Sequence, residues 1–340
     1  MAVLGSRFVT LLDVSKSKDP KVGKVAEVLV KWNAMTKDIP YQPMNENTIH
    51  REEIRSGLPA VYYRKANQAI PPSKTTTEER TFSAAHFESK SQIDHAVAAR
   101  GGMQNISYNR WNQAQGHLQS HANEIASLMI YGSPVDSNRK TPGFFDIYST
   151  LAAGEETAKQ IVDAGGTGTD NASILLVVWG ENSVFGVFPS GTTAGLTRID
   201  RSPGNTQIQI PALDHLGNAG SFWGYEEDFH TDHGLVVKDF RQAARAANID
   251  VSNLVSGTGA ADLFDIMTDL TYKVDSLDAG QAVFYVNRTI EAALDKQARA
   301  AVGDGSGITY QNYQGERVLT FRGIPIRRMD AMTNGEQRVV

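Results

Sequence analysis

Residues 49–79 have the sequence IHREEIRSGLPAVYYRKANQAIPPSKTTTEE, in which charged and apolar side chains alternate. The alternation has a period of two residues over 49–55 and again over 61–65, and this period is typical of β-strands. We predict strands here, with a turn at the Ser-Gly pair of residues 56–57. After the pair of prolines that follows, residues 73–93 are again extended and polar. The segment therefore predicts a long β-ribbon.

This ribbon has few large apolar side chains with which to cover a face. Between residues 73 and 93 the sizeable ones are Phe82, Phe87 and Ile93. A two-stranded ribbon is marginal in isolation, so the segment is either a mobile surface loop or a ribbon that lies across a neighbouring subunit. Its charges have both signs, which suits pairing with another copy of the same surface better than phosphate binding. They are carried by Arg51, Glu52, Glu53, Arg55, Arg64, Lys65, Glu78, Glu79 and Arg80.

Residues 107–130 predict a long helix, because Trp111, Leu118 and Ile125 belong to one apolar stripe at helical spacing. At ~1.5 Å per residue the helix is roughly 36 Å long. Its other faces are rich in Asn, Gln and Ser. We expect it to lie against a sheet with one side uncovered.

The other elements are shorter, and together they indicate an α+β protein. Helices are predicted at 19–37, 240–247, 260–272 and 289–301, and strands at 282–287, 308–314, 315–321 and 324–329. Residues 173–189 hold two apolar runs separated by Gly-Glu-Asn-Ser, which predicts a hairpin and the best candidate for the core.

Length and composition exclude several classes of protein. A chain of 340 residues corresponds to about two domains. Its net charge of −5 gives no basic field to concentrate nucleic acid, so a sequence-reading DNA binder is not expected. The absence of cysteine excludes disulfides, thiol catalysis and iron–sulfur clusters. The amino terminus does not resemble a secretory signal, and the apolar run 174–179 is far too short to cross a membrane. We expect a soluble cytoplasmic product.

Motifs for catalysis are weak. The Gly-rich segments 165–169 and 303–307 match neither a phosphate-binding loop nor a dinucleotide fingerprint. His117 and His121 share a helix face, but their neighbours are Gln, Ser and Asn, which favours solvated or interface histidines.

The richest cluster comprises Glu226, Glu227, Asp228, His230, Asp232 and His233. Strand alternation separates His233 from Glu226, Asp228, His230 and Asp232. We therefore predict no catalytic residue, no metal site and no cofactor, with a metal-dependent enzyme using residues 226–233 as the alternative.

Several segments carry a family resemblance. Residues 49–79 closely resemble the extended-loop region of tailed-bacteriophage major capsid proteins. Four further segments resemble the same family in the same order. They are LGSRFVTLLDVSKSKDP from residue 4, GLVVKDFRQAARAANID from residue 234, AVFYVNRTIEAALDKQA from residue 282 and FRGIPIRRMDAM from residue 321.

The resemblance implies the α+β capsid fold that tailed phages share with encapsulins and the herpesvirus capsid floor. It implies an N-terminal arm at 1–44, an extended loop at 45–94, a peripheral domain with the spine helix at 95–150, a mainly axial domain at 151–303 and closing strands of the peripheral domain at 304–340. Permuted versions of this fold exist, so the strand connectivity stays open.

The resemblance also implies a structural function rather than an enzymatic one. Subunits would form hexamers and pentamers of an icosahedral virion capsid, assembled in the host cytoplasm, that encloses double-stranded DNA by non-specific contact. The implied partners are the chain itself, a separate scaffolding protein and a portal protein; a decoration protein is left open, and no membrane is involved. An encapsulin-like shell is the alternative with the same fold. Expected ribbon contacts between subunits are Arg51, Arg55, Arg64, Glu78, Glu79 and Arg80, with Asn112, Gln115 and Gln119 on the inner face of the spine helix.

Overall fold

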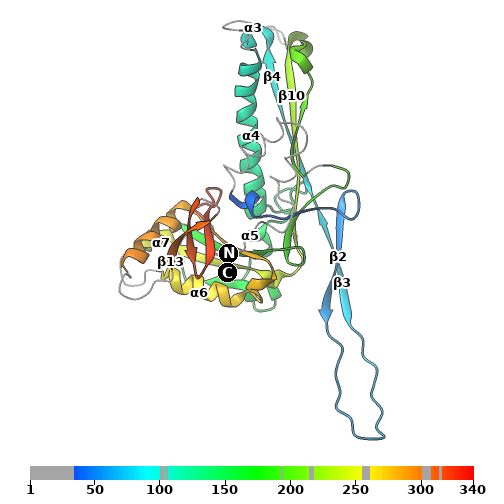
Figure 1. The fold of residues 1–340 in the computed structure, drawn as a ribbon, viewed down its shortest axis with the longest axis vertical. Coiled ribbons are helices and arrows are strands. Elements are labelled where there is room, and N and C mark those ends of the chain that lie inside the picture. Colours follow the sequence, from blue (N-terminus) through cyan, green and yellow to red (C-terminus); the bar gives the residue numbers. More distant parts are fainter. Residues whose placement is uncertain are drawn as a thin grey trace.

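The computed structural model describes residues 34–99, 103, 106–192, 194–213, 218–254, 261–300, 308–313 and 316–340. Figure 1 shows an upright part built around the long helix α4, a body of sheet and helices beside its lower end, and a ribbon that projects away from both. Strand β10 belongs to the upright part and to the body, because it pairs with β4 in the first and with β7 in the second.

The body is organised around strand β6 (Asn171–Trp179), which is buried along its whole length. On one side β6 pairs in antiparallel register with β11 (Ala243–Asp250), and on the other with β12 (Gln281–Val286). A strand covered on both faces is apolar throughout rather than alternating. This requirement explains the uninterrupted run of apolar residues at 174–179.

Alternate side chains of β6 enter two different cores. Ile174 and its even-numbered neighbours pack with α6 (Leu263–Lys273) and α7 (Arg288–Ala300). Leu175 and the odd-numbered residues pack with residues of α4 and α5. The sheet of the body is therefore enclosed between helices on both faces.

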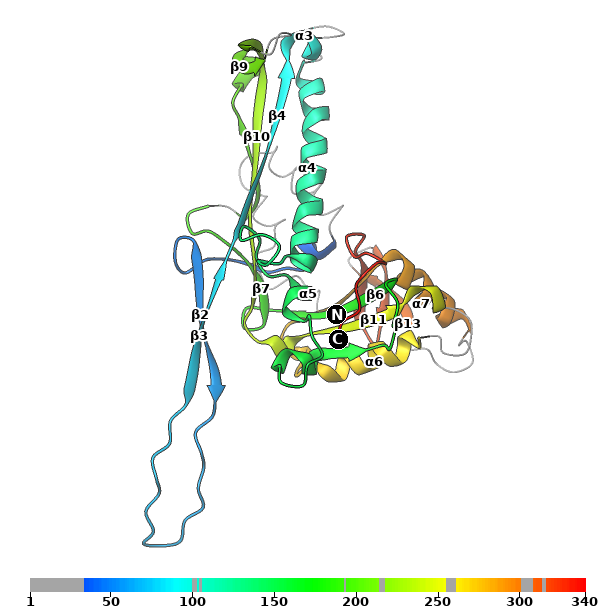
Figure 2. The ribbon, with the colours of Figure 1, turned by 180° about the vertical axis from the view of Figure 1, so that it is seen from behind.

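The upright part consists of α4 (Ile106–Tyr131) lying along strands β4 (Ala85–Asp94) and β10 (Ala219–Val237). Figure 2 shows the three elements side by side from behind. Strands β8 (Gly195–Asp200) and β9 (Ile208–Leu213) also pair with β10 in antiparallel register. The sheet covers one face of α4 and leaves the opposite face uncovered, as the amphipathic pattern predicts.

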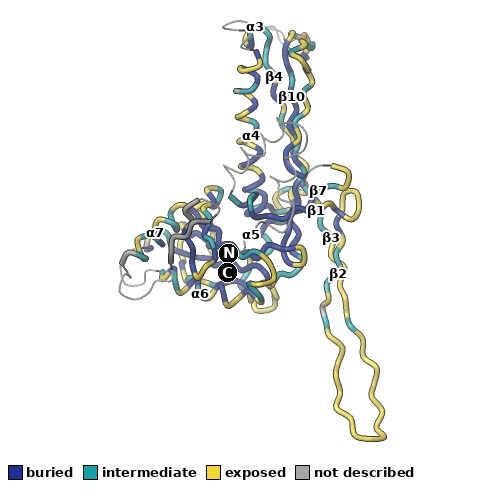
Figure 3. Tube along the Cα trace, viewed as in Figure 1, coloured by how far each residue is buried: buried dark blue, intermediate teal, exposed yellow. Residues whose placement is uncertain are grey.

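The ribbon consists of β2 (Ile49–Gly57) paired in antiparallel register with β3 (Thr76–Ser83). Between them residues 58–74 are exposed without exception. Figure 3 shows this contrast along the chain, with buried strands in the body and an exposed loop at the far end of the ribbon. The ribbon is therefore an extension of the fold that has no core of its own at its tip.

The remaining elements connect these parts. The strands are β1 (Tyr41–Pro43), β5 (Ile161–Asp163), β7 (Val184–Phe188), β13 (Ile308–Tyr313), β14 (Glu316–Phe321) and β15 (Ile324–Arg328). The short helices are α3 (His95–Ala98) and α5 (Phe144–Ile147), and the 3-10 turns are η1 (Ala34–Lys37), η3 (Glu156–Gln160), η4 (Pro203–Asn205), η5 (Phe240–Gln242), η6 (Val251–Asn253) and η7 (Leu277–Ala279).

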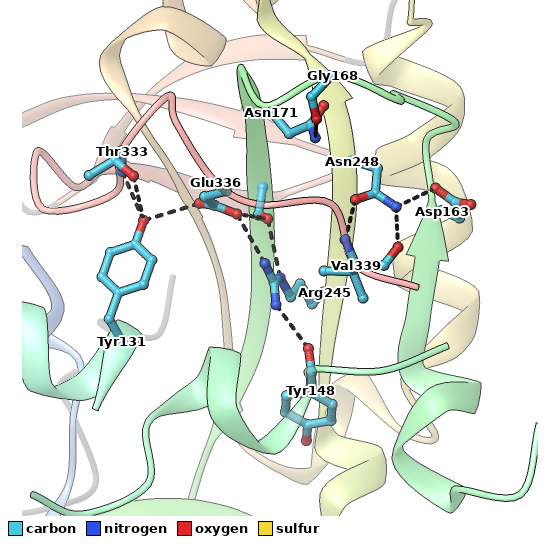
Figure 4. A network of polar contacts seen from close by, with 11 residues as sticks. Tyr131, Tyr148, Asp163, Gly168, Asn171, Arg245, Asn248, Thr333, Glu336 and Val339 are labelled. Carbon is cyan, nitrogen blue, oxygen red and sulfur yellow. Dashed lines mark hydrogen bonds and ion pairs between the residues drawn. The ribbon is translucent and has the colours of Figure 1, made fainter. Parts of the chain in front are cut away.

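A buried polar network joins the C-terminal tail to the body (Figure 4). Arg245 of β11 donates to Glu336 at 3.0 Å and to the carbonyl oxygen of Tyr148 at 2.9 Å. Glu336 also accepts from the hydroxyl of Ser173 and from that of Tyr131, the latter at 3.1 Å. The network thus connects the tail to β6, β11 and the end of α4.

The last residues continue this attachment. The side-chain amide of Asn248 bonds to both the N–H and the carbonyl oxygen of Val339, at 2.8 and 2.9 Å. The Leu151 N–H donates to the Val340 carbonyl oxygen at 3.0 Å. The tail is therefore an integral part of the body, held by both polar side chains and backbone hydrogen bonds.

Several predicted elements are confirmed. The long helix is α4, the helix at 260–272 is α6, and the helix at 289–301 is α7. The predicted strands near the C-terminus correspond to β12, β13, β14 and β15. The helix predicted at 19–37 lies outside the described residues, except for its last four, which form η1.

The hairpin predicted at 173–189 is wrong. Strands β6 and β7 share one parallel pair, Trp179 with Val184, and no antiparallel ladder. Both edges of β6 are taken by β11 and β12, so β7 pairs with β10 and β1 instead. Ser183 secures the connection by donating from its hydroxyl to the carbonyl oxygen of Val178 at 2.8 Å.

Two further local predictions are wrong. Residues 240–247, predicted as a helix, form η5 and most of strand β11. Alanine favours helices, but these alanines are buried against β6 and the helices around it, and sheet pairing overrides the local preference. The predicted turn at 56–57 is absent: β2 passes through a register shift between Arg55 and Gly57, and after Gly57 the chain continues outward to residue 75 before it returns as β3.

The strand pairing does not follow the boundaries of two predicted domain ranges, 151–303 and 304–340. Part of the range 151–303 lies in the upright part, because β8, β9 and most of β10 pair beside α4. The closing strands β13–β15 extend the sheet of the body through the parallel pair of β15 with β12. The tail that follows them reaches α4 at Tyr131.

Candidate functional site

The base of the ribbon is fixed to the body. His50 is buried and meets the ring of Phe185 edge-on, with the ring centroids 5.6 Å apart. Glu52 forms an ion pair with Lys238, the residue after β10, at 2.9 Å, and Phe82 packs against the small apolar cluster that includes Phe185. The ribbon is therefore held at one end.

The far end of the ribbon is an exposed loop that carries apolar side chains. The most exposed are Tyr63, Val61 and Leu58, at 104%, 90% and 78% of their full accessible surface, and Tyr62 and Ile70 are about half exposed. Within the loop, the Ser73 hydroxyl donates to the Ala60 carbonyl oxygen at 3.0 Å. Clustered exposed apolar residues mark interaction surfaces. The strand predicted at residues 61–65 is wrong, because these residues belong to the exposed loop. Their two-residue alternation does not reveal that the apolar side chains form a surface.

The charged residues predicted as ribbon contacts lie on its surface. Arg51 forms ion pairs with Glu79 at 3.0 Å and with Glu46 at 3.1 Å. Arg80 and Glu78 approach to 4.0 Å. Exposed pairs of this kind stabilise a fold by about 0–1 kcal/mol each. Arg55 and Arg64 are also exposed, and the contact roles of all six residues remain predictions.

One feature of the ribbon's register works against its stability. Glu53 lies directly opposite Glu79 across the two strands. Like charges at directly opposed positions are destabilising, and Arg51 offsets this by pairing with Glu79. A ribbon with such a pair and few buried apolar side chains is only marginally stable by itself.

The uncovered face of α4 is polar and almost neutral. Gln115 and Gln119, two of the residues predicted on the inner face, are exposed there. Ser120 and Asn123 are exposed as well, with Glu124 as a charged neighbour. The side chain of Asn112 lies outside the described residues. The structure thus places two of the three predicted side chains on one accessible surface.

The histidines of α4 face the strands rather than solvent. The ring of His117 stacks on Phe229 of β10 with a centroid distance of 5.4 Å. His121 is buried and bonds to the Ser89 hydroxyl at 2.8 Å and the Thr231 hydroxyl at 2.9 Å. Both are therefore part of the packing between α4 and the sheet.

Burial lowers the pKa of two histidines, His121 and His233. It lowers the pKa of His121 from 6.5 to about 4, with smaller contributions from His117 and His230. It also lowers the pKa of His233 to about 4; the hydroxyl of Tyr41 lies 3.3 Å from the Nδ1 atom of His233. The folded protein keeps both imidazoles neutral at pH values where the unfolded chain is protonated.

Acid is expected to destabilise the fold through these two groups. When folding lowers the pKa of a histidine, the free energy of unfolding of the protein decreases as the pH falls below the pKa of the unfolded state. The decrease is complete once the pH is below the pKa of the folded state. The window here is from pH 6.5 to about 4. At pH 5 the cost is about 2 kcal/mol for each histidine. Urea unfolding at pH 7.5 and at pH 5 measures it, and His233→Gln should reduce the difference by about half; an undiminished difference would contradict the assignment to His233.

The acidic cluster at 226–233 is divided by strand alternation, as predicted. On the α4 side, Glu227 is buried and bonds to Arg198 and Arg110, each at 2.7 Å. On the other side, Asp228 bonds to Arg201 at 2.6 Å and lies 3.6 Å from Lys90. Glu227 thus joins the sheet to α4 through Arg110, whereas Asp228 joins β10 to β4 and to the residue after β8, so the cluster shares no single site.

Three comparisons relate the chain to known proteins. The model of the family "Major capsid protein GP7" matches residues 17–340. No curated protein matches the chain. Of the described helices, none has both the length and the apolar character needed to span a bilayer.

The chain is also similar to chains of solved structures. A chain in the near-atomic-resolution structure of bacteriophage epsilon15 is 29% identical, with a TM-score of 0.69, and the similarity covers 100% of this chain and 99% of that one. A chain of the bacteriophage JBD30 capsid is 8% identical, with a TM-score of 0.45 over 86% of this chain and 89% of that one. The SrpI encapsulin of Synechococcus elongatus PCC 7942 is 10% identical, with a TM-score of 0.43 over 66% and 90%.

The family match takes in the ribbon, α4 and the whole body, and the epsilon15 similarity extends over the full chain. The arrangement described above, with an anchored ribbon and an upright helix beside a sheet, is the mixed helix-and-sheet fold of phage capsid proteins. The chain therefore belongs to the major capsid protein GP7 family and is a structural subunit of a phage capsid shell.

Proposed function

We propose that this subunit forms hexamers and pentamers of an icosahedral shell around double-stranded DNA, and that the ribbon reaches onto a neighbouring subunit. The observation that carries the proposal is the ribbon itself, whose base is buried against Phe185 and Lys238 while the loop at 58–74 is exposed. Burying Val61, Tyr63 and Leu58 on a neighbour would contribute about 25 cal/mol for each Å² of apolar surface removed from water. The charged contacts would fix the register more than they add affinity.

The proposed parts of the subunit follow the strand pairing. Residues 1–44, of which 1–33 lie outside the described part of the chain, are the proposed N-terminal arm, and residues 45–94 are the proposed extended loop. The peripheral domain consists of residues 95–150 together with β8 and β9, which pair with β10 beside α4, while β4 is the last strand of the extended loop. The axial domain is the body, including the closing strands. Contacts of this subunit with its neighbours would then come from the arm, the ribbon and the body together.

We further propose that the exposed face of α4, with Asn112, Gln115 and Gln119, faces the interior. The neutral side-chain amides of Asn and Gln can form hydrogen bonds with phosphates and base edges, and they add no positive charge to the surface. Since strong phosphate binding depends on Lys and Arg, such a face suits packaged DNA that must later leave. The proposed partners are a separate scaffolding protein and a portal protein, with assembly in the host cytoplasm and no enzymatic activity of the subunit itself.

Assembly and proteolysis test this proposal together. The purified chain is imaged by electron microscopy with and without its scaffolding partner, and free and assembled forms are digested lightly with trypsin. We expect shells or capsomers, and much slower cleavage at Arg64, Lys65 and Lys74 once assembled, because a neighbour covers the loop. A chain that stays monomeric under all conditions, or a loop cleaved equally fast in shells and free subunits, would overturn the proposal.

The family match favours the phage shell over an encapsulin-like compartment and over a metal-dependent enzyme at residues 226–233. The charge pairs of Glu227 and Asp228 support the same choice, because their carboxylates already hold arginines and Lys90.

A further inference from the structure

Four ionisable side chains meet on the open face of the β4–β10 pair. The antiparallel register places His230 opposite Glu88 and Asp232 opposite His86. His86 and Glu88 are two residues apart on β4, and His230 and Asp232 are two apart on β10, so all four project to the same side of the sheet. This is the side away from α4, and the side chains of His86 and Glu88 are about half exposed there.

The metal-binding atoms of three of these residues converge. The Nε2 atom of His86 lies 2.8 Å from Glu88 Oε1, and the Nδ1 atom of His230 lies 3.1 Å from the same oxygen. One ligand atom from each residue can be chosen so that all three lie within 4.8 Å of one another. In a tetrahedral zinc site with bonds of about 2.0–2.1 Å, ligand atoms are roughly 3.3 Å apart. Small side-chain rotations would therefore bring the three onto one ion.

The fourth residue has the position of an outer-shell partner. Asp232 Oδ1 lies 2.6 Å from the Nδ1 atom of His86, the ring nitrogen that does not face Glu88. A carboxylate on the far nitrogen of a ligating histidine sets its tautomer and ring orientation, and metal sites in proteins use this arrangement repeatedly. The ring of His86 is thus oriented with Nε2 toward Glu88.

The charges around this cluster differ from those of its neighbours on the same face. Farther along the strands, Glu226 pairs with Lys90 and Asp228 pairs with Arg201. In the described part of the chain, the ion pairs of Glu88 and Asp232 are with His86 and His230 alone. The carboxylates of Glu88 and Asp232 bring two negative charges to the cluster, and a divalent cation would neutralise them.

We propose that His86, Glu88 and His230 bind a divalent first-row transition ion of the Zn²⁺ class, with Asp232 as the positioning residue. Two imidazoles and one carboxylate suit Zn²⁺, Co²⁺ or Ni²⁺, whereas Ca²⁺ and Mg²⁺ prefer oxygen ligands throughout. A fourth position faces solvent and would hold water. The ion would join β4, which continues from the ribbon, to β10, which enters the body, and this role is independent of the proposed contacts between subunits.

Co²⁺ absorption and Zn²⁺ calorimetry on the untagged full-length chain test the site. We expect one Co²⁺ ion to bind to each chain, with the visible absorption that is typical of Co²⁺ of low coordination number. Zn²⁺ should displace the Co²⁺, and Mg²⁺ should not. Glu88→Gln and His230→Gln each remove one ligand and should abolish the spectrum. Asp232→Asn should leave its shape unchanged while weakening Zn²⁺ binding by about 10- to 100-fold.

His95→Gln is the matched control, because it removes an imidazole from α3, which follows directly after β4, and leaves the cluster intact. It should bind Zn²⁺ as the unaltered chain does. Circular dichroism checks that each variant folds. Absence of binding at millimolar Co²⁺, equal binding by Glu88→Gln and the unaltered chain, or displacement by Mg²⁺ would each overturn the proposal.

Discussion

Glu336→Ala is expected to lower the free energy of unfolding by about 3–5 kcal/mol, since it leaves the buried guanidinium of Arg245 without its partner. Arg245 and Glu336 are 4% and 7% exposed, and their closest atoms are 3.0 Å apart. Burial raises the pKa of Glu336, and the main opposing influence is the charge of Arg245. The same change also removes acceptors for Tyr131 and Ser173.

Urea unfolding of the full chain at neutral pH measures this loss. The matched control is Asp330→Ala, which removes a carboxylate paired with Arg328 on the surface of the same C-terminal segment. Exposed pairs contribute about 0–1 kcal/mol, so the control should remain close to the unaltered chain. A similar loss in both variants would contradict the role of burial.

A double change separates the cost of an unpaired charge from the value of the pair. Replacing both residues with apolar ones, Arg245→Met with Glu336→Leu, should recover most of the stability lost in Glu336→Ala. The reason is that a buried ion pair often contributes little more than well-packed apolar side chains of similar volume. A double variant as unstable as the single one would show that the network's geometry, rather than charge balance, holds the tail.

Replacement of residues 58–75 by an Asn-Gly turn is expected to abolish shell formation and leave the subunit folded. The base of the ribbon keeps His50, Glu52 and Phe82 in the body, so the cores lose nothing. The deleted loop holds the exposed apolar residues that we propose to be buried on a neighbour. Two-residue Asn-Gly connections suit antiparallel strands.

Electron microscopy and sedimentation measure assembly, and thermal unfolding checks the fold. A variant of full loop length, with Val61, Tyr63 and Ile70 changed to serine, should also fail to form shells. Its matched control changes Lys65 and Lys74 to serine and should assemble. Closed shells from the shortened chain would show that the ribbon is dispensable and would contradict its proposed role.

Much of the secondary structure follows from local pattern. The stripe through Leu118 and Ile125 is sufficient for α4, because one apolar face of a helix is decided by spacing alone. The apolar run at 174–179 is sufficient for a core strand, since a strand buried on both faces must be apolar throughout. Two-residue alternation over 49–55 likewise predicts β2. It does not show where the ribbon ends, because the exposed loop beyond it contains Val and Tyr as a strand would.

Partners and register do not follow from local pattern. Residues 243–247 form a strand against their alanine content, because pairing with β6 buries them on both faces. Glu88 meets His230 across 142 positions of sequence, and Arg245 meets Glu336 across 91. Each meeting depends on which strands pair and in what register, and a slip of one residue would turn His230 and Asp232 toward α4. Local spacing therefore decides which segments are helix or strand, whereas free energy summed over the whole packed sheet decides which side chains come together.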